Sequence, residues 1–216
     1  MELIKKLKMG IIIFLSTYIP IQYNIELLRY ISFLISVICS YELYSQVIIK
    51  SKNNNFFTYL FYFYWLFFPV IIINFLYNLL DIFNIIMITT FSDIAQQLSN
   101  RIFVKIYTKK DTLYNLMLYN PFRYLSPKKT IIGYLGGFTT LTLYFYFDYN
   151  VNLLFFLYIF GCIGDLLASY FKRKYNIKDY SNYLGAHGGF LDRFDSIIFN
   201  INYFYIHTLV FNISKY

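Results

Sequence analysis

The chain has 216 residues, of which 58% are hydrophobic, 24% are aromatic and only 14% are charged. This composition excludes an ordinary soluble domain, in which about a quarter of the residues carry charge. The formal net charge is +8, but the basic residues lie in short loops beside apolar runs and form no separate basic face, which argues against a nucleic-acid partner.

An all-α, polytopic membrane fold is predicted by the apolar runs, which are long enough to cross a bilayer core as helices of about 20 residues. We predict about seven transmembrane helices on this basis. The N-terminal lysines precede the first run as in a signal peptide, but no small-residue cleavage site follows, so we expect an uncleaved span. In chain order, the predicted spans are Met9–Tyr23, Leu27–Ile49, Phe56–Tyr77, Leu79–Leu98, Ile131–Phe147, Val151–Tyr170 and Phe194–Ile213.

Lys and Arg residues concentrate in alternate loops, which predicts the orientation because short basic loops stay on the cytosolic side of a membrane. The N-terminal lysines, the loop at Lys50 and the polar loops 101–129 and 172–193 all fall on one side. We therefore expect a multi-pass protein with both long polar loops in the cytosol. Apolar residues and lysines are interleaved over 100–120, which favours equally an amphipathic surface helix and a solvated loop.

Oxygen-bearing side chains cluster at the ends of the last two predicted spans. Asp165 and Ser169 are four residues apart and share one helix face, and Asp192 and Asp195 are three apart at the start of the final span. Hard oxygen ligands of this kind suit Mg²⁺, which keeps further positions for water and phosphate oxygens. We predict that Asp165, Asp192 and Asp195 are catalytic and that they bind the metal together with Ser169.

Two other acidic residues lie within or at the end of predicted spans, where ionisable groups are costly. Asp93 lies in the fourth predicted span, and Glu42 lies near the cytosolic end of the second. Because Glu42 can reach the membrane interface from this position, a functional role for it is the less favoured interpretation.

Basic residues fill the loop between the two acidic clusters, namely Lys172, Arg173, Lys174 and Lys178. Such point charges and forked donors bind phosphate groups. The alternative is ordinary positive-inside anchoring, but anchoring does not require acidic residues beside the basic ones. We therefore favour a phosphate-binding loop.

Two glycine-containing segments are further candidates for phosphate binding. Gly188 and Gly189 can present N–H groups to an anion after His187, which can itself donate to a phosphate, although a simple turn explains this motif as well. The segment from Ser126 through Lys128 and Lys129 offers hydroxyl and ammonium donors. The glycines that follow it, at positions 133, 136 and 137, either cradle phosphate or allow close helix packing.

One string of residues at set spacings ends the C-terminal half: Ser169, Lys172, Arg173, Lys178, Asp179, Ser181, Leu184, Gly185, His187, Gly188, Gly189, Asp192, Arg193, Phe194 and Asp195. This string resembles the C-terminal signature of the phosphatidate cytidylyltransferase (CDP-diacylglycerol synthase) family. The segment 126–137 is similar to that family's Ser-Pro-Lys-Lys-Thr segment with paired glycines, and Ser92-Asp93 to the acidic start of the preceding helix. The chain departs from the family pattern after Asp93, where Ser99, Asn100 and Val104 stand in a region that usually carries glycine.

This resemblance implies an enzyme, a nucleotidyltransferase of phospholipid biosynthesis that converts CTP and phosphatidate to CDP-diacylglycerol and pyrophosphate. It implies a two-cation centre, with Mg²⁺ and a second ion such as K⁺, at the four oxygen ligands named above. Phosphate contacts would come from Lys172, Arg173, Lys178 and Arg193, and a homodimer is expected. We assign residues 1–91 to N-terminal transmembrane helices and 92–216 to a C-terminal catalytic transmembrane region of one integral domain.

Other functions remain open at this point. A polyprenol kinase or an archaeal-lipid cytidylyltransferase would also use CTP at a membrane, and a CDP-alcohol phosphotransferase would have differently spaced acidic residues. A transporter or channel would fit the helices but is expected to show inverted repeats with broken helices, which we do not find in the sequence.

Overall fold

The computed structural model is helical throughout the part of the chain that it describes and contains no strand there. The described residues are 25–48, 79–107, 111–127, 129–147, 149–185 and 188–211. The elements are α2 (Ile25–Leu43), the π-helical turn η1 (Tyr44–Ile48), α4 (Leu79–Ile106), α5 (Thr112–Met117), α6 (Ile131–Phe145), α7 (Val151–Lys174) and α8 (Leu191–Phe211). The all-α prediction is confirmed for these residues.

Every predicted span that falls on described residues corresponds to a helix. The predicted first residues of α4, α6 and α7 are those observed, and α8 begins at Leu191, slightly before the predicted Phe194. Helix α4 runs on to Ile106, so much of the polar segment that follows the predicted span is helical. The spans predicted over 9–23 and 56–77 lie outside the described residues.

Within the described part of the chain, two helices are long and apolar enough to cross a membrane, namely α2 together with part of η1 (Glu26–Gln46) and α7 (Val151–Lys174). Helix α6 is apolar but shorter. These helices fit a membrane protein, and their length agrees with the roughly 20 residues that a bilayer core requires.

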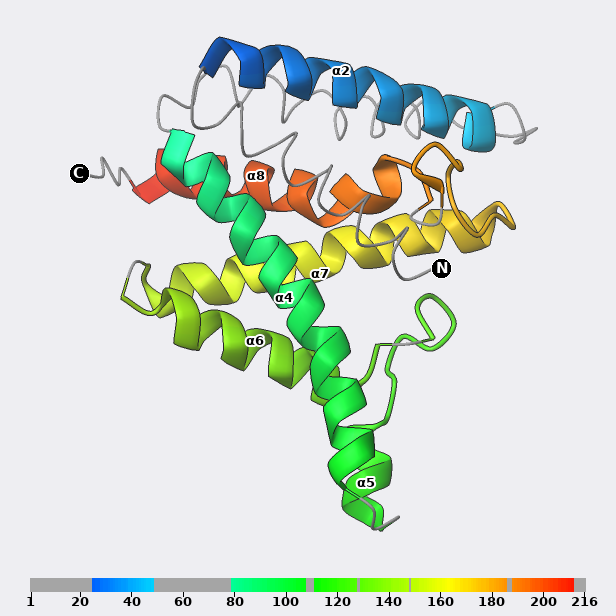
Figure 1. The fold of residues 1–216 in the computed structure, drawn as a ribbon, viewed down its shortest axis with the longest axis vertical. Coiled ribbons are helices and arrows are strands. Elements are labelled where there is room, and N and C mark those ends of the chain that lie inside the picture. The colour runs from blue at the N-terminus through cyan, green and yellow to red at the C-terminus, as the bar shows by residue number, and fades with distance from the viewer. Residues whose placement is uncertain are drawn as a thin grey trace.

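Helices α7 and α8 run side by side, and α2 lies along the other side of α8 (Figure 1). Helix α4 crosses these helices obliquely and packs most extensively against α6 (Figure 1). The C-terminal end of α4 extends beyond this body together with α5 (Figure 1). The polar ends of α2, α7 and α8 consequently lie near one another.

Two apolar clusters hold these helices together. The larger one joins α4, α6, α7 and α8 with α2 at its edge, and Leu154 and Leu157 of α7 lie fully buried within it. The smaller cluster joins Cys39 and Leu43 of α2 to Leu191 of α8 and to the buried ring of Tyr180. The smaller cluster therefore lies beneath the loop that connects α7 to α8.

Glycines bring the helices into close contact at two seams. An added Cβ on Gly164 would lie 2.7 Å from the backbone oxygen of Asp195, so α7 and α8 approach closely beside Asp165. On the other seam, a Cβ on Gly133 or Gly137 would meet α4 at Gln96 at 3.0 Å or less. The glycines after the Ser126 segment thus serve helix packing at these two positions, which is the common role of small residues between membrane helices.

Candidate active site at the ends of helices α7 and α8

Asp165 lies on α7, and its carboxylate accepts from two groups. One oxygen forms an ion pair with Lys129 from the loop before α6, and the other accepts a hydrogen bond of 3.4 Å from the Ser169 hydroxyl. The predicted proximity of Asp165 and Ser169 on one helix face is confirmed. The ion pair brings the Ser126–Lys129 segment, which is distant in sequence, to the end of α7.

Lys129 is held in this site electrostatically. Burial disfavours its charge, but the carboxylates of Asp165 and Asp93 outweigh that effect and raise the pKa of Lys129 above its ordinary value. Since a raised lysine pKa keeps the ammonium charged, Lys129 carries a positive charge throughout the neutral range.

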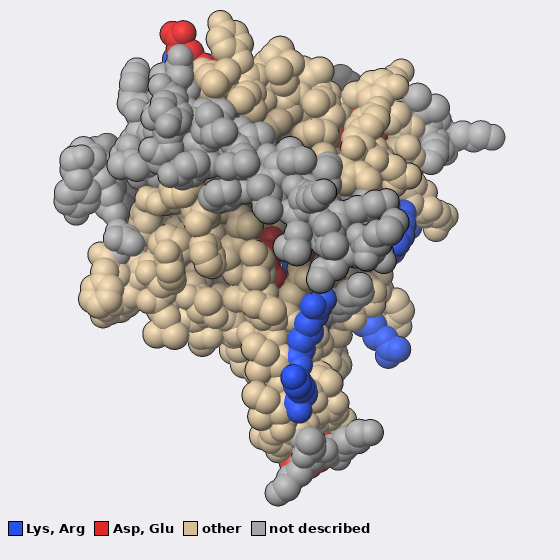
Figure 2. All heavy atoms as spheres, in the orientation of Figure 1, with Lys and Arg blue, Asp and Glu red and all other residues tan. Residues whose placement is uncertain are grey.

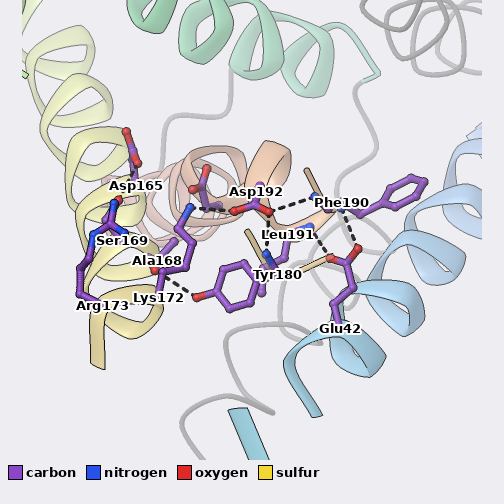
Figure 3. A network of polar contacts seen from close by, with 12 residues as sticks. Glu42, Asp165, Ala168, Ser169, Lys172, Arg173, Tyr180, Phe190, Leu191 and Asp192 are labelled. Atoms are coloured by element: carbon purple, nitrogen blue, oxygen red, sulfur yellow. Dashed lines mark hydrogen bonds and ion pairs between the residues drawn. The ribbon is translucent and has the colours of Figure 1, made fainter. Parts of the chain in front are cut away.

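Asp192 forms the centre of a second polar network, shown in Figure 3 between Lys172 of α7 and the start of α8. One carboxylate oxygen forms an ion pair of 2.7 Å with the Lys172 ammonium, and the other accepts from the backbone N–H groups of Tyr180 and Gly189, both at 2.9 Å. The Asp192 side chain is only 2% exposed. Its negative charge is therefore compensated by one cation and two amide dipoles.

Asp195 is buried one turn further along α8. Its Oδ1 accepts from the backbone N–H of Ser196 at 2.8 Å. It lies within electrostatic range of Asp165, Lys172 and Asp93. The close α7–α8 seam at Gly164 explains why Asp195 and Asp165, which lie on different helices, interact.

The other predicted basic residues occupy the rim of this region. The Arg173 Nε donates to the backbone oxygen of Leu125 at 3.4 Å, so Arg173 links the end of α7 to the segment before Ser126. Lys178 is exposed in the loop after α7, and Arg193 is exposed in the first turn of α8, within electrostatic reach of Asp93. In Figure 2, Lys and Arg atoms gather beside the projecting end of the molecule, and acidic atoms are visible in a recess near them.

The predicted glycine and Ser126 sites already use their backbone groups within the chain. The Gly188 N–H donates to the Gly185 carbonyl and the Gly189 N–H to Asp192. The Ser126 carbonyl accepts from the Asn120 side chain at 2.8 Å and from the Lys129 N–H at 3.3 Å. In this structure these groups shape turns, and Lys128 and His187 lie outside the described residues.

Glu42 joins the site from α2, contrary to our interpretation of it as an interfacial side chain. It is 1% exposed, and it accepts from the Ser181 hydroxyl and from the N–H groups of Phe190 and Leu191 (Figure 3). The signal that was available in the sequence was the cost of an acidic residue near the end of an apolar span. Its partners are 139 to 149 residues away, too distant for any local pattern to identify them.

A magnesium ion fits part of this donor set by its chemistry. Asp165, Ser169 and Asp195 offer carboxylate and hydroxyl oxygens from two adjacent helices, which are the ligands Mg²⁺ prefers. Asp192 already binds Lys172, Tyr180 and Gly189, just as Asp165 binds Lys129 and Ser169. Among the described residues, no group of three or more His, Cys, Asp or Glu side chains is arranged to hold a metal ion, so metal binding by Asp165, Ser169, Asp192 and Asp195 stays a prediction.

Similarity to known proteins covers most of the chain at the family level. Residues 3–211 match the cytidylyltransferase family. A phosphatidate cytidylyltransferase of Aquifex aeolicus (strain VF5) is 41% identical over 88 residues, which are 38% of this chain and 34% of that relative. The enzyme of the same name from Staphylococcus haemolyticus (strain JCSC1435) is 42% identical over 86 residues, 35% of this chain and 33% of the relative.

The Staphylococcus aureus (strain COL) phosphatidate cytidylyltransferase gives 41% identity over 86 residues, again 35% of this chain and 33% of the relative. The chain thus spans about a third of the length of the curated relatives it matches. No solved structure matches it. Because the family match extends over nearly all of the sequence, the chain belongs to the cytidylyltransferase family.

Proposed function

We propose that this protein is a phosphatidate cytidylyltransferase, which transfers the cytidylyl group of CTP to phosphatidate and releases pyrophosphate. The observation that carries the proposal is the pairing of Asp165 with Lys129 and of Asp192 with Lys172 at neighbouring helix ends. These pairs supply the acidic and basic groups that a reaction between two anionic substrates requires. The names of the matched relatives agree with this activity.

The chemistry requires charge neutralisation more than a protein nucleophile. A phosphate oxygen of phosphatidate attacks the α-phosphorus of CTP, forming a new P–O bond while the bond to the β-phosphate oxygen breaks. The phosphate monoester is itself anionic near neutral pH, since its second pKa is about 6. The chain's task is to bring two anions together and to stabilise the departing pyrophosphate.

Lys129 and Lys172 are suited to that task. Each ammonium is largely buried and forms an ion pair with a carboxylate. Phosphate groups entering the site compete with the carboxylates for these ammonium groups, and charge-assisted hydrogen bonds to phosphate are strong. Release of the lysines leaves Asp165 and Asp192 free to bind other cations.

We further propose that Asp165, Ser169 and Asp195 hold Mg²⁺, joined by Asp192 when substrate is present, with a second cation such as K⁺ nearby. When bound, Mg²⁺ supplies Lewis-acid stabilisation of the phosphate charge. On this proposal, Arg173, Lys178, Arg193, His187 and the Ser126–Lys129 segment bind the phosphate groups, and Gly188 and Gly189 shape the turn that holds Asp192.

We propose that the protein crosses the membrane about seven times and that this site lies at the cytosolic edge of the membrane. The acyl chains of the substrate then stay in lipid while its headgroup meets CTP. Residues 92–216 carry the catalytic groups, residues 1–91 supply N-terminal helices, and a homodimer is expected.

The test is transfer of label from CTP to lipid by the purified protein in detergent with Mg²⁺. Label at the α-phosphate enters phosphatidate only by cytidylyl transfer, whereas label at the γ-phosphate enters a polyprenol only by kinase action. Replacing phosphatidate with an ether-linked archaeal lipid phosphate tests whether the protein is instead an archaeal-lipid cytidylyltransferase. We expect α-label in phosphatidate, its loss in Asp192→Asn, and normal activity in Asp111→Asn, an exposed acid at the start of α5. Absence of α-label from every lipid would refute the proposal.

A further inference from the structure

Glu42 is a buried carboxylate whose partners all come from one segment, as far as the described residues go. It lies in the last turn of α2 and is 1% exposed. Burying a carboxylate is costly unless hydrogen bonds compensate its charge. Here the compensation comes from the Ser181 hydroxyl and from the N–H groups of Phe190 at 3.0 Å and Leu191 at 2.8 Å.

These N–H groups form the N-terminal end of α8, which begins at Leu191. The first N–H groups of a helix lack partners within it, and the positive end of the helix dipole favours a negative charge. Glu42 therefore caps α8 from another helix. Asp192 accepts from Gly189, the neighbouring residue, so the two carboxylates together bind three successive N–H groups.

Gly189 is complementary to Glu42 in shape. A Cβ at this position would lie 2.7 and 2.8 Å from the two Glu42 carboxylate oxygens, closer than side-chain atoms pack. The second glycine of the His-Gly-Gly motif thus makes room for the capping carboxylate. The contact with Glu42 is a sufficient reason for glycine at position 189, so phosphate binding is not needed to explain this residue.

We propose that Glu42 is a positioning residue for the active site: it anchors the start of α8 and thereby sets the places of Asp192 and Asp195. The role in catalysis rests on the proposed function, and the anchoring itself does not. Both acids lie in the first two turns of α8, so a displacement of its first residues moves them relative to Lys172 and Asp165. Misplacement of reacting groups by about 1 Å can lower a rate about 100-fold.

The test compares Glu42→Gln with Glu26→Gln, which changes an exposed acid at the other end of the same helix. Glutamine keeps the size of the side chain but loses the charge and turns one acceptor into a donor. We expect kcat per folded protein to fall at least about tenfold, with the KM for CTP changing less than about twofold. Ser181→Ala removes one donor without exposing a charge, and we expect a loss of about threefold.

A second readout is independent of catalysis. Cys39 lies fully buried one turn before Glu42, in the seam that α2 forms with α7 and α8. Its alkylation by N-ethylmaleimide, measured on its own peptide, reports opening of this seam, and Cys162 on α7 is the internal control. We expect Glu42→Gln to raise the Cys39 labelling rate about tenfold and to leave Cys162 unchanged.

Wild-type kcat with wild-type protection of Cys39 in Glu42→Gln would overturn the inference, as would a loss of kcat while Cys39 stays fully protected. If the wild-type protein transfers no label from CTP but Cys39 still responds to Glu42→Gln, the anchoring stands and the proposed activity fails.

Discussion

Gly164→Ala is the sharpest perturbation of the site that touches none of its charged groups. The added methyl would lie 2.7 Å from the Asp195 carbonyl oxygen, whereas ordinary contacts begin at 3.4 Å, a shortfall of 0.7 Å. Because the obstructing atom is backbone, α7 and α8 must separate. The separation falls next to Asp165 and directly at Asp195.

The energetic effect has two opposing parts. Overpacking of this kind costs about 1–3 kcal/mol, while alanine in a helix interior is favoured over glycine by about 0.5–1 kcal/mol. We expect a net loss of about 1–2 kcal/mol, which lowers the midpoint of thermal unfolding by about 2–8 °C for a chain of this size. Activity should fall further than stability, by about tenfold or more, because the two acids move apart.

Gly161→Ala is the matched control, one helical turn earlier on α7. Its added methyl meets the Asn200 side-chain nitrogen at 3.0 Å, and a side chain can yield by the few tenths of an ångström required. Unfolding midpoints in detergent and α-label transfer at 25 °C would be measured for both variants. Our reasoning about the seam is refuted if Gly164→Ala is as active and stable as wild type, or if Gly161→Ala is equally damaging.

Further substitutions test the remaining contacts. Lys172→Met leaves the buried Asp192 carboxylate without its cation, so we expect a loss of stability of about 3–5 kcal/mol. The double variant Lys172→Met/Asp192→Asn should regain part of this stability but no activity. Chemical denaturation of the single and double variants measures the stability. Lys129→Ala removes the cation of the second ion pair, and we expect the KM for CTP to rise about tenfold in steady-state assays, whereas an unchanged KM would remove Lys129 from the phosphate site. Gly188 has a φ of +79°, and a methyl added there would lie 2.9 Å from Asp192, whereas Gly185 has a φ of +58° and no atom within 4 Å. Thermal unfolding should show that Gly188→Ala and Gly185→Ala each lower the stability by about 1–2 kcal/mol. Only Gly188→Ala should also lower the activity.

Local sequence signals predicted the helices well because their ends depend on neighbouring residues. Thr130 accepts from the Gly133 N–H at the start of α6, and Asn150 accepts from the Asn152 N–H at the start of α7. Such caps lie within three residues of the groups they satisfy, so a pattern read along the chain contains both partners. The predicted span ended at Leu98, short of the observed end of α4 at Ile106, because polar residues interrupt the apolar run there; the pattern beyond residue 100 left helix and loop equally open.

The site was predicted less completely, since its contacts join residues far apart in the chain. Helical spacing placed Ser169 beside Asp165, but no spacing rule connects Lys129 with Asp165 or Lys172 with Asp192. Both pairs arise because the start of α6, the C-terminal part of α7 and the start of α8 lie near one another. The sequence supported separate metal-binding acids and phosphate-binding bases, whereas the structure pairs Asp165 with Lys129 and Asp192 with Lys172.

This pairing has a physical reason that also explains the position of Glu42. Asp192 can bind Lys172 with one oxygen and backbone N–H groups with the other only while the N-terminus of α8 lies beside the end of α7. The α8 N-terminus has more N–H groups than Asp192 can accept from, and Glu42 takes the next two. Without Glu42 these groups would be buried without partners, at about 1–3 kcal/mol each, or would turn toward another acceptor and carry Asp192 with them. Glu42 on α2, which is distant in sequence from the segment 165–195, therefore determines the geometry of Asp192 and Asp195 within that segment.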